Sequence, residues 1–269
     1  MSNPQPRLAV TTGRVEREGQ RALVEHLAAE LGVPIVERRE RSTLRIIEAE
    51  GLEALVVVNN ERLHYIDSTG EPFFWHPNMA VVRIGAVRVH GREDLLARAC
   101  DLRPGDRVLD ATLGLGADAI VASWHVGPSG AVVGLEASPV IACLVRHGLA
   151  TYEHRLAPVL RNISVITGNH TGVWHDDAFF EPGFEVIYFD PMFEQPIGSS
   201  SGLAGLRPLA CYDRPDAEVL AAARARAKRR VVVKGRAVDP WLQDLQPDRW
   251  VQGRHRRLAY AVFETDRGE

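Results

Sequence analysis

The sequence has few cysteines and no metal-binding pattern. Three cysteines occur in 269 residues, and no two of them have CxxC spacing, which excludes a disulfide framework and a zinc site. The ten histidines form no HxH or HExxH pair, so we expect no metal. Scattered, unpaired cysteines are typical of a reducing compartment, and we therefore expect a cytoplasmic protein. The three residues are Cys100, Cys143 and Cys211.

Long hydrophobic runs are missing as well. No apolar run approaches the roughly 20 residues of a membrane span, so we expect no membrane segment. The first residues, MSNPQPRLAV, lack a basic head followed by an apolar stretch, and no signal peptide is expected. The 45% hydrophobic and 25% charged residues are globular averages, which excludes a disordered or fibrous chain. The length predicts one large domain, or one with a small partner.

A strong charge of one sign is also absent, because the formal net charge is -3. Basic residues nevertheless gather between 224 and 257, where eleven Lys or Arg and three Asp leave a local net charge of +8. Such a patch predicts a phosphate-binding face, and a solvated helix with a strand end is the alternative. Lysine itself is scarce, with 2 residues against 30 arginines. The expected phosphate contacts are Arg229, Arg230, Lys234, Arg254, Arg256 and Arg257.

The pattern of apolar residues divides the chain into two parts. Residues 1–90 are predicted to form a small α/β subdomain, with a strand at 7–11 and a hairpin-like pair at 54–59 and 62–67. Residues 91–269 alternate strands and helices, which predicts an α/β, doubly wound and mostly parallel sheet. Ligands of such sheets bind at the carboxyl ends of the strands. The expected strands are 107–111, 131–136, 163–167, 185–190, 230–234 and an antiparallel 257–263; the expected helices are 117–125, 139–150 and 216–228.

A glycine-rich turn, DATLGLG, follows the first strand of this sheet and contains Asp110, Thr112, Gly114 and Gly116. Glycines let a ligand approach the backbone, and Glu136 at the end of the next strand can accept from both ribose hydroxyls of an adenosine. The spacing also satisfies the dinucleotide pattern GxGxxA. Asp110, however, would repel a pyrophosphate and suits a cation such as the sulfonium of S-adenosylmethionine (SAM). The combination resembles the class I methyltransferase pattern, and a turn without a ligand is the alternative.

Gly168, Asn169 and His170 follow the third strand. In class I methyltransferases an acidic or amide residue at this point meets the adenine amino group, and the Asn169 side-chain carbonyl could do so. Asn and Gly can equally form a simple turn. Both interpretations stay open.

The fourth strand ends in Asp190, Pro191, Met192 and Phe193. This DPMF segment resembles the (Asp/Asn)-Pro-Pro-aromatic tetrad of methyltransferases that alkylate exocyclic amines. The Asp190 carboxylate and the Pro191 carbonyl can accept hydrogen bonds from the two N–H groups of an aryl amine. These bonds turn the lone pair of the amine toward the methyl donor. Phe193 can stack on a base taken out of its helix. Met192 departs from the tetrad, and a strand-ending turn with a core phenylalanine is the alternative.

A hydrolase is a further possibility, because GSSSG matches GxSxG with Ser200 as its nucleophile. That motif requires a strand-turn-helix context, which the proline- and glycine-rich surroundings do not offer. We instead expect residues 195–212 to form a mobile loop that covers the substrate.

The segments DATLGLGADAIVAS, GLEASPVIACLVRHGL and VIYFDPMF together resemble the RsmJ-type family of small-subunit ribosomal RNA guanine-N2 methyltransferases and its Gram-positive relatives. The resemblance covers about residue 70 to the end and implies a Rossmann-like methyltransferase fold, SAM as cofactor, and ribosomal RNA or the small ribosomal subunit as partner. It also implies that the SAM site is lined by Ala117, Asp118, Glu136, Ala137, Asn169, His170 and Asp190. Asn169 and His170 depart from the small hydroxyl residues of the type enzymes. The alternatives are methylation of a small-molecule or protein amine, and a regulatory protein that binds SAM without turnover.

Overall fold

The structure is a computed structural model that describes residues 6–15, 19–60, 62–192, 206–253 and 258–265. Its contacts divide the chain into two compact units. The smaller unit comprises residues 1–76, 138–152 and 195–211, and the larger unit comprises residues 77–137, 153–194 and 212–269. The predicted division at residue 90 stays a prediction. Five residues singled out from the sequence lie outside the described ranges: Phe193, Ser200, Arg254, Arg256 and Arg257.

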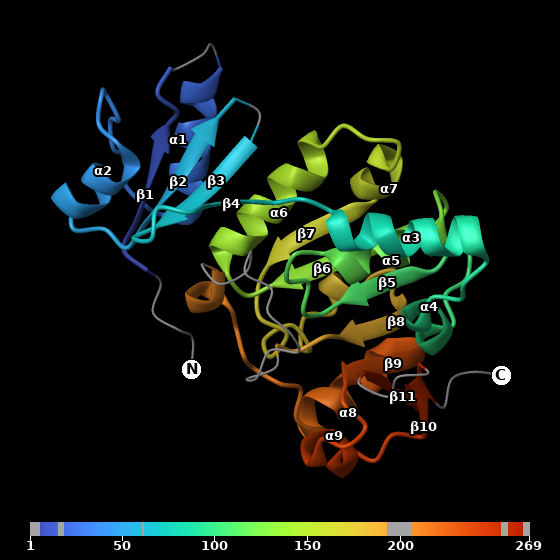
Figure 1. Ribbon diagram of the computed structural model, residues 1–269. Coiled ribbons are helices and arrows are strands. Elements are labelled where there is room, and N and C mark those ends of the chain that lie inside the picture. The colour runs from blue at the N-terminus through green and yellow to red at the C-terminus, as the bar shows by residue number, and fades with distance from the viewer. Residues whose placement is uncertain (1–5, 16–18, 61, 193–205, 254–257, 266–269) are drawn as a thin grey trace. The chain divides into compact units, whose positions relative to one another are not determined.

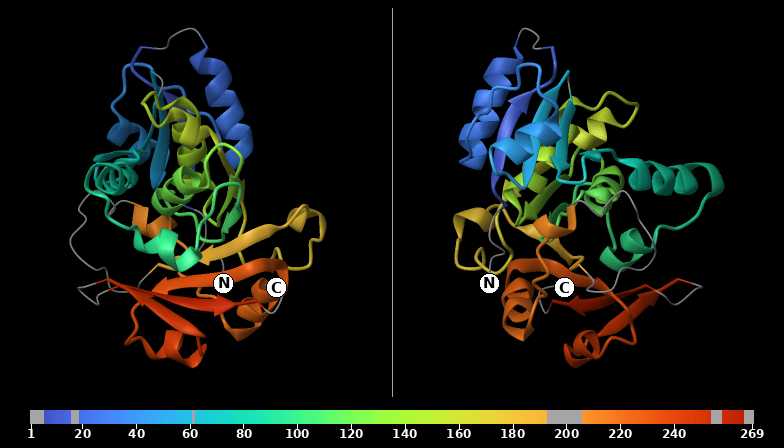
Figure 2. Two further views of the ribbon diagram at one scale, coloured as in Figure 1. Left: turned by 90° about the vertical axis from the view of Figure 1, so that its right-hand side faces the viewer. Right: turned by 60° about the vertical axis from the view of Figure 1, so that its left-hand side comes forward.

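The larger unit contains a seven-stranded sheet in the order β10-β11-β9-β8-β5-β6-β7 (Figures 1 and 2). The five strands from β9 to β7 run parallel, and β11 and β10 are antiparallel to their neighbours. This confirms the predicted doubly wound, mostly parallel sheet and its antiparallel final strand. The bounds are β5 (Arg107–Asp110), β6 (Ala131–Glu136), β7 (Ile163–Thr167), β8 (Phe184–Phe189), β9 (Ala227–Gly235), β10 (Arg249–Gln252) and β11 (Ala259–Glu264).

Alternating side chains of β8 contact helices on opposite faces of this sheet. Ile187 and Phe189 join a core with Leu220 of α8 (Ala217–Arg226), whereas the intervening Tyr188 reaches Asp118 of α5 (Ala117–Val126). Helices α3 (Asn78–His90) and α4 (Leu95–Cys100) contact α5. Short helical segments complete the unit: α7 (Ala157–Arg161), η1 (Ala178–Phe180) and α9 (Pro240–Asp244). None of the helices in the described ranges is long and apolar enough to cross a membrane.

The smaller unit contains a four-stranded sheet in the order β1-β2-β3-β4. Strand β1 pairs in parallel with β2, and β2 pairs antiparallel with β3, with Ala54 opposite Asp67, as the hairpin-like pattern predicted. Helix α6 is begun by the Ser138 hydroxyl, which accepts from the backbone of Ile141, and it contacts β3. The bounds are β1 (Leu8–Thr12), β2 (Ala54–Asn59), β3 (Arg62–Asp67), β4 (Pro72–Phe74), α1 (Gln20–Leu31), α2 (Thr43–Ala49) and α6 (Pro139–Thr151).

Helix α6 passes very close to the ring of Trp75 in the smaller unit. A Cβ atom at Gly148 would lie 2.2 Å from Cε3 of Trp75, whose side chain is buried. We therefore expect Gly148→Ala to destabilise the protein by about 1–3 kcal/mol, the usual cost of overpacking a core. Gly85 of α3 is the matched control, because a Cβ there meets no atom within 4 Å.

Gly85→Ala should stabilise the protein by about 0.5–1 kcal/mol, since alanine loses less conformational freedom in a helix. Urea unfolding of both variants measures the two free energies. A Gly148→Ala protein as stable as the wild type would contradict the close packing of α6 on Trp75.

Candidate active site

The glycine-rich turn joins the end of β5 to the start of α5. Gly114 (φ 52°) and Gly116 (φ 77°) adopt left-handed conformations that favour glycine. The backbone N–H of Gly114 donates to the carboxylate of Glu136, at 2.9 Å, so the turn is attached to the end of β6. Asp110 and Glu136 are both buried. Two strand-ending carboxylates therefore border the same turn, as the sequence predicted for neighbouring parallel strands.

The residues around this turn fit SAM. A Cβ atom at Gly114 would meet nothing within 4 Å, which leaves open space beside the backbone. Burial raises the pKa of Asp110 well above its usual range, and the nearby Asp118 adds to this effect. A bound ammonium or sulfonium would favour the ionised form of Asp110, and the Glu136 carboxylate suits ribose hydroxyls. In the ranges that the structure describes, His, Cys, Asp and Glu form no group of three that could hold a metal.

Asp190 follows β8 and lies beside the glycine turn. Its backbone N–H donates to Thr112 Oγ1 at 2.5 Å, which attaches the start of the DPMF segment to the turn. The Asp190 side chain is 29% exposed, so a substrate can reach its carboxylate. Pro191 is buried and Met192 is exposed. The strand-ending acid predicted to act on the substrate thus lies next to the turn predicted to bind the cofactor.

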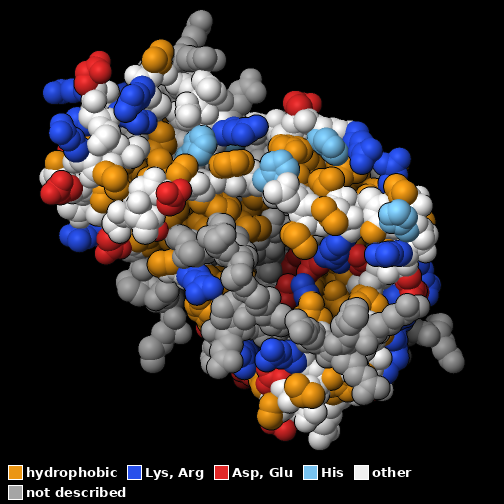
Figure 3. Space-filling view, viewed as in Figure 1, with side chains coloured by type: hydrophobic (Ala, Val, Ile, Leu, Met, Phe, Trp, Pro, Cys, Tyr) orange, Lys and Arg blue, Asp and Glu red, His pale blue; other side chains and the backbone are white. Residues whose placement is uncertain are grey.

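A buried ionic network lies behind Asp190. Nζ of Lys234, near the end of β9, is 2.7 Å from Oδ2 of Asp190 and 2.9 Å from Oδ2 of Asp118. The hydroxyl of Tyr188 donates to the same Asp118 oxygen at 2.8 Å. Oδ1 of Asp118 accepts from the Arg83 guanidinium. Figure 3, which has the same view as Figure 1, shows acidic and basic side chains beside one another in a hollow of the surface, among apolar side chains.

Arg83 is a site residue that sequence reasoning missed. It lies on α3 and forms a two-pronged pair with Asp94, with N···O distances of 3.0 and 2.9 Å. Asp94 also caps α4 by accepting from the backbone of Leu96. The available signal was weak: Arg83 is a charged residue within an apolar helical stretch, MAVVRIGAVRV. Such a residue is as easily a surface position.

The network shifts the pKa values of its members in different directions. Burial opposes the charged form of Asp118, but Lys234 and Arg83 outweigh it and hold the pKa of that carboxyl well below its usual range. Burial also opposes the charge of Lys234, but Asp118 and Asp190 raise the pKa of its ammonium. Burial raises the pKa of Asp190 to about 6, Lys234 opposes this rise, and Asp118 adds to it. Asp118 and Lys234 are therefore a fixed ion pair, while Asp190 can change charge near neutral pH.

The residues after β7 form local contacts. The Asn169 side-chain oxygen accepts from the backbone of Thr171 at 3.0 Å, and its amide donates to Asp213 at 2.7 Å. His170 is buried edge-on against Phe189, and burial lowers the pKa of its imidazole. The turn interpretation of Asn169 matches these contacts, and its contact with adenine stays a prediction.

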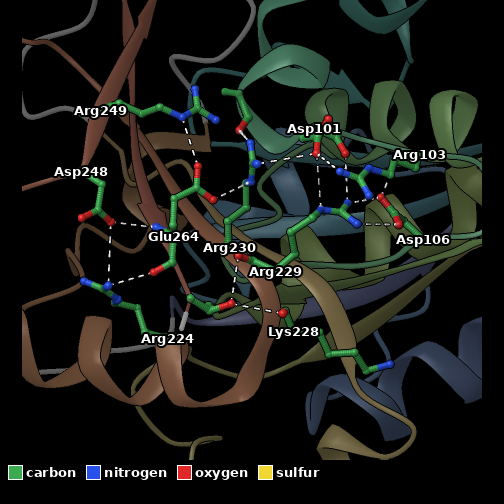
Figure 4. Close-up of polar contacts among 12 residues, drawn as sticks. Asp101, Arg103, Asp106, Arg224, Lys228, Arg229, Arg230, Asp248, Arg249 and Glu264 are labelled. Atoms are coloured by element: carbon green, nitrogen blue, oxygen red, sulfur yellow. Dashed lines mark hydrogen bonds and ion pairs between the residues drawn. The ribbon is translucent and has the colours of Figure 1, made fainter. Parts of the chain in front are cut away.

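In the described part of the basic stretch, most of the basic side chains pair with acidic side chains of the larger unit (Figure 4). Arg229 pairs with Asp106 and Asp101, and Arg230 pairs with Glu264 at 3.2 Å. Both arginines lie near the start of β9, whereas Lys234 lies near its end. The two arginines therefore lie apart from Lys234 along the strand. The sequence had instead predicted one phosphate-binding face for all three. The other pairs are Arg224–Asp248, Arg226–Asp177, Lys228–Glu185 and Arg249–Glu264.

Most of the predicted site residues meet at the carboxyl edge of the sheet, although their roles stay predictions. Ala117 begins α5, and Ala137 directly follows β6. Asp118 faces protein partners with both carboxylate oxygens. Lys234, predicted to bind a substrate phosphate, contacts two carboxylates.

Comparisons with known proteins point in the same direction as this geometry. A family model described as "Putative SAM-dependent methyltransferase" matches residues 75–263. Ribosomal RNA small subunit methyltransferase J of Thioalkalivibrio sulfidiphilus (strain HL-EbGR7) is 33% identical over 261 residues, which cover 93% of this chain and 96% of that protein. The uncharacterized protein YpiP of Bacillus subtilis (strain 168) is 36% identical over 204 residues, 75% of this chain and 78% of that one.

A solved structure is similar over nearly the whole chain. The SAM-dependent methyltransferase from Neisseria gonorrhoeae superposes with a TM-score of 0.65 at 19% identity, and the match covers 97% of both chains. At this identity the likeness concerns the fold. It agrees with the predicted Rossmann-like sheet.

Proposed function

Because the chain belongs to the family of SAM-dependent methyltransferases that includes ribosomal RNA small subunit methyltransferase J, we propose that it methylates the exocyclic N2 amine of a guanine in small-subunit ribosomal RNA. The observation that carries the proposal is the attachment of Asp190 to the glycine turn through Thr112, at 2.5 Å. It brings an acceptor for an amine N–H beside the residues that fit the cofactor.

SAM is the cofactor of this family, and when bound it supplies an electrophilic methyl group, the C–S bond pair returning to sulfur as the new N–C bond forms. Asp110, Gly114 and Glu136 would hold it. On the substrate side, Asp190 and the Pro191 carbonyl accept the two N–H groups of the guanine amine and orient its lone pair. Asp190 then takes the proton that the methylated nitrogen loses, and passes it to solvent. Phe193 stays a predicted stacking residue for the flipped base.

RNA is favoured over a small-molecule or protein amine by the name of the relative that matches over nearly its whole length. The predicted phosphate contacts Arg254, Arg256 and Arg257 precede β11 and remain part of this proposal. We also propose a cytoplasmic location, since the sequence has three scattered cysteines without CxxC spacing, a pattern typical of a reducing compartment.

The test compares ribosomal RNA from a strain lacking the gene with RNA from the complemented strain. Mass spectrometry of nuclease digests should show one N2-methylguanine position that is lost in the deletion strain and restored by the wild-type gene. Purified protein should then methylate RNA or subunits from the deletion strain and leave wild-type material unchanged. Identical methylguanine maps in the two strains would exclude this substrate, and labelling of a protein or small molecule instead would favour the alternative amine.

A further inference from the structure

We propose that Lys234 is a positioning residue, which holds Asp190 ionised and turns its Oδ1 toward the substrate amine by binding Oδ2. This assignment rests on the proposed function, in which Asp190 accepts from the amine. It replaces the phosphate contact that the sequence suggested for Lys234. The ammonium lies 2.7 Å from Oδ2 of Asp190, and its side chain is 16% exposed, so it is poorly placed to meet an RNA backbone.

The identity of the residue supports this role. The chain uses 30 arginines and 2 lysines, yet a lysine occupies this position. An ammonium is a compact charge with three donors, and here it contacts Asp118 at 2.9 Å and Asp190 at 2.7 Å at once. A guanidinium is a larger, planar group, and Arg83 uses it to contact both Asp94 and Asp118. At Lys234 a single nitrogen contacts both carboxylates, whereas Arg83 uses different guanidinium nitrogens for its two partners.

The charges that face Asp190 give Lys234 a second task. Burial and the charge of Asp118 on α5 oppose ionisation of Asp190, and Asp110 on β5 is a further carboxyl, whose pKa the nearby Asp190 raises. The hydroxyls of Tyr188 and Tyr260 are neutral, because burial raises the pKa of each. Arg83 on α3 pairs with Asp94 and Asp118. Lys234 is therefore the cation in direct contact with Asp190 among the described residues, and without it the neutral acid is favoured.

A neutral Asp190 would be a poorer partner for the reaction. Protonation places a hydrogen on one oxygen and removes the negative charge that stabilises the positive charge developing on the amine nitrogen. Loss of Lys234 should thus act on the rate of transfer through the ionisation of Asp190. A purely structural role would lower the amount of folded protein without moving the pH at which Asp190 ionises.

The first measurement uses the protein without cofactor or RNA. Aspartate labelled with 13C at Cγ is incorporated, the Asp190 resonance is assigned by its loss in Asp190→Asn, and its chemical shift is followed against pH. In Lys234→Met the Asp190 midpoint should rise by at least one pH unit. In Asp118→Asn it should fall, because a repelling carboxylate is removed. Lys234→Arg keeps the charge and should stay near the wild-type midpoint.

The second measurement is the pH profile of kcat at saturating SAM and RNA. In Lys234→Met the acid limb should move upward with the NMR midpoint, so that kcat at pH 6 falls about tenfold for each pH unit and recovers at high pH. Lys228→Met is the matched control, since the chain's other lysine pairs with the partly exposed Glu185 and lies at the start of β9. It should leave the profile unchanged.

The outcomes separate this inference from the proposed function. An unchanged Asp190 midpoint in Lys234→Met, or a rise in Asp118→Asn, overturns the role of Lys234 even if the wild type methylates RNA. If Lys234→Met does not fold, the direction of the Asp118→Asn shift decides. Opposite shifts in the two variants, with a wild type that leaves guanine unmodified, would support the positioning role and refute the substrate.

Discussion

Asp190→Asn should lower kcat about 10²–10⁴-fold, the usual contribution of a positioned acid or base. Asparagine keeps one acceptor oxygen but lacks the charge that stabilises the methylated nitrogen before it loses its proton. The variant should still fold, because the backbone N–H that donates to Thr112 is retained. Transfer of a tritiated methyl group to RNA from the deletion strain, at saturating SAM and pH 8, measures the loss.

Glu185→Gln is a suitable control for this change. Glu185 lies on β8, the strand that Asp190 follows, but its carboxylate pairs with Lys228 and the backbone of Arg107 near the opposite end of the strand. It should reduce stability slightly and leave kcat unaltered. A kcat for Asp190→Asn within tenfold of the wild type would contradict the role of Asp190 as the acceptor of the amine N–H.

Cofactor binding should weaken as the pH falls, with Asp110 as the cause. In the free protein burial raises the pKa of Asp110 well above its usual range, and a bound cation lowers that pKa again. Binding therefore releases a proton wherever Asp110 is protonated in the free protein. Below the pKa of the free protein, affinity for SAM or S-adenosylhomocysteine should fall about tenfold per pH unit.

Titration calorimetry in two buffers of different ionisation enthalpy counts the released proton directly. Asp110→Asn should weaken binding by about 1–3 kcal/mol, the cost of losing a charged partner, and should abolish the proton release. The affinity of this variant should then depend little on pH. Proton release that persists in Asp110→Asn would assign the titration to another group and remove Asp110 from the cofactor site.

The sheet was predictable because each parallel strand is a short, buried, β-branched run between helical segments. Strand β8 illustrates this, since FEVIYF is buried at five of its six positions, and its neighbours have similar patterns. Strand β10 was not predicted, because RWVQ buries only Val251 fully and shows neither an apolar run nor clear alternation. Its place depends on antiparallel pairing with β11, a contact that local sequence does not encode.

The candidate site was predictable only in part, and charge was the least reliable guide. Asp110, Glu136 and Asp190 each end a strand, and strand ends of a parallel sheet converge at one edge. Arg229 and Arg230 were expected in a phosphate-binding face, but they form ion pairs with Asp106 and Glu264. These acidic partners lie far away in sequence. A local charge count omits partners that only folding supplies.

The sequence by itself determined which strand each candidate site group follows. A glycine turn follows the first strand of the larger sheet, a carboxylate the second, and an Asp-Pro pair the fourth. These are local signals, because they depend on backbone conformation and on residues adjacent along the chain. Tertiary structure alone decided how the charges pair. Lys234 joins Asp118 and Asp190, which are 116 and 44 residues away, and Arg83 enters from a helix without a motif. Ion pairs form between side chains that packing brings together, and the spacing of two residues in the sequence does not determine the distance between their charges in space.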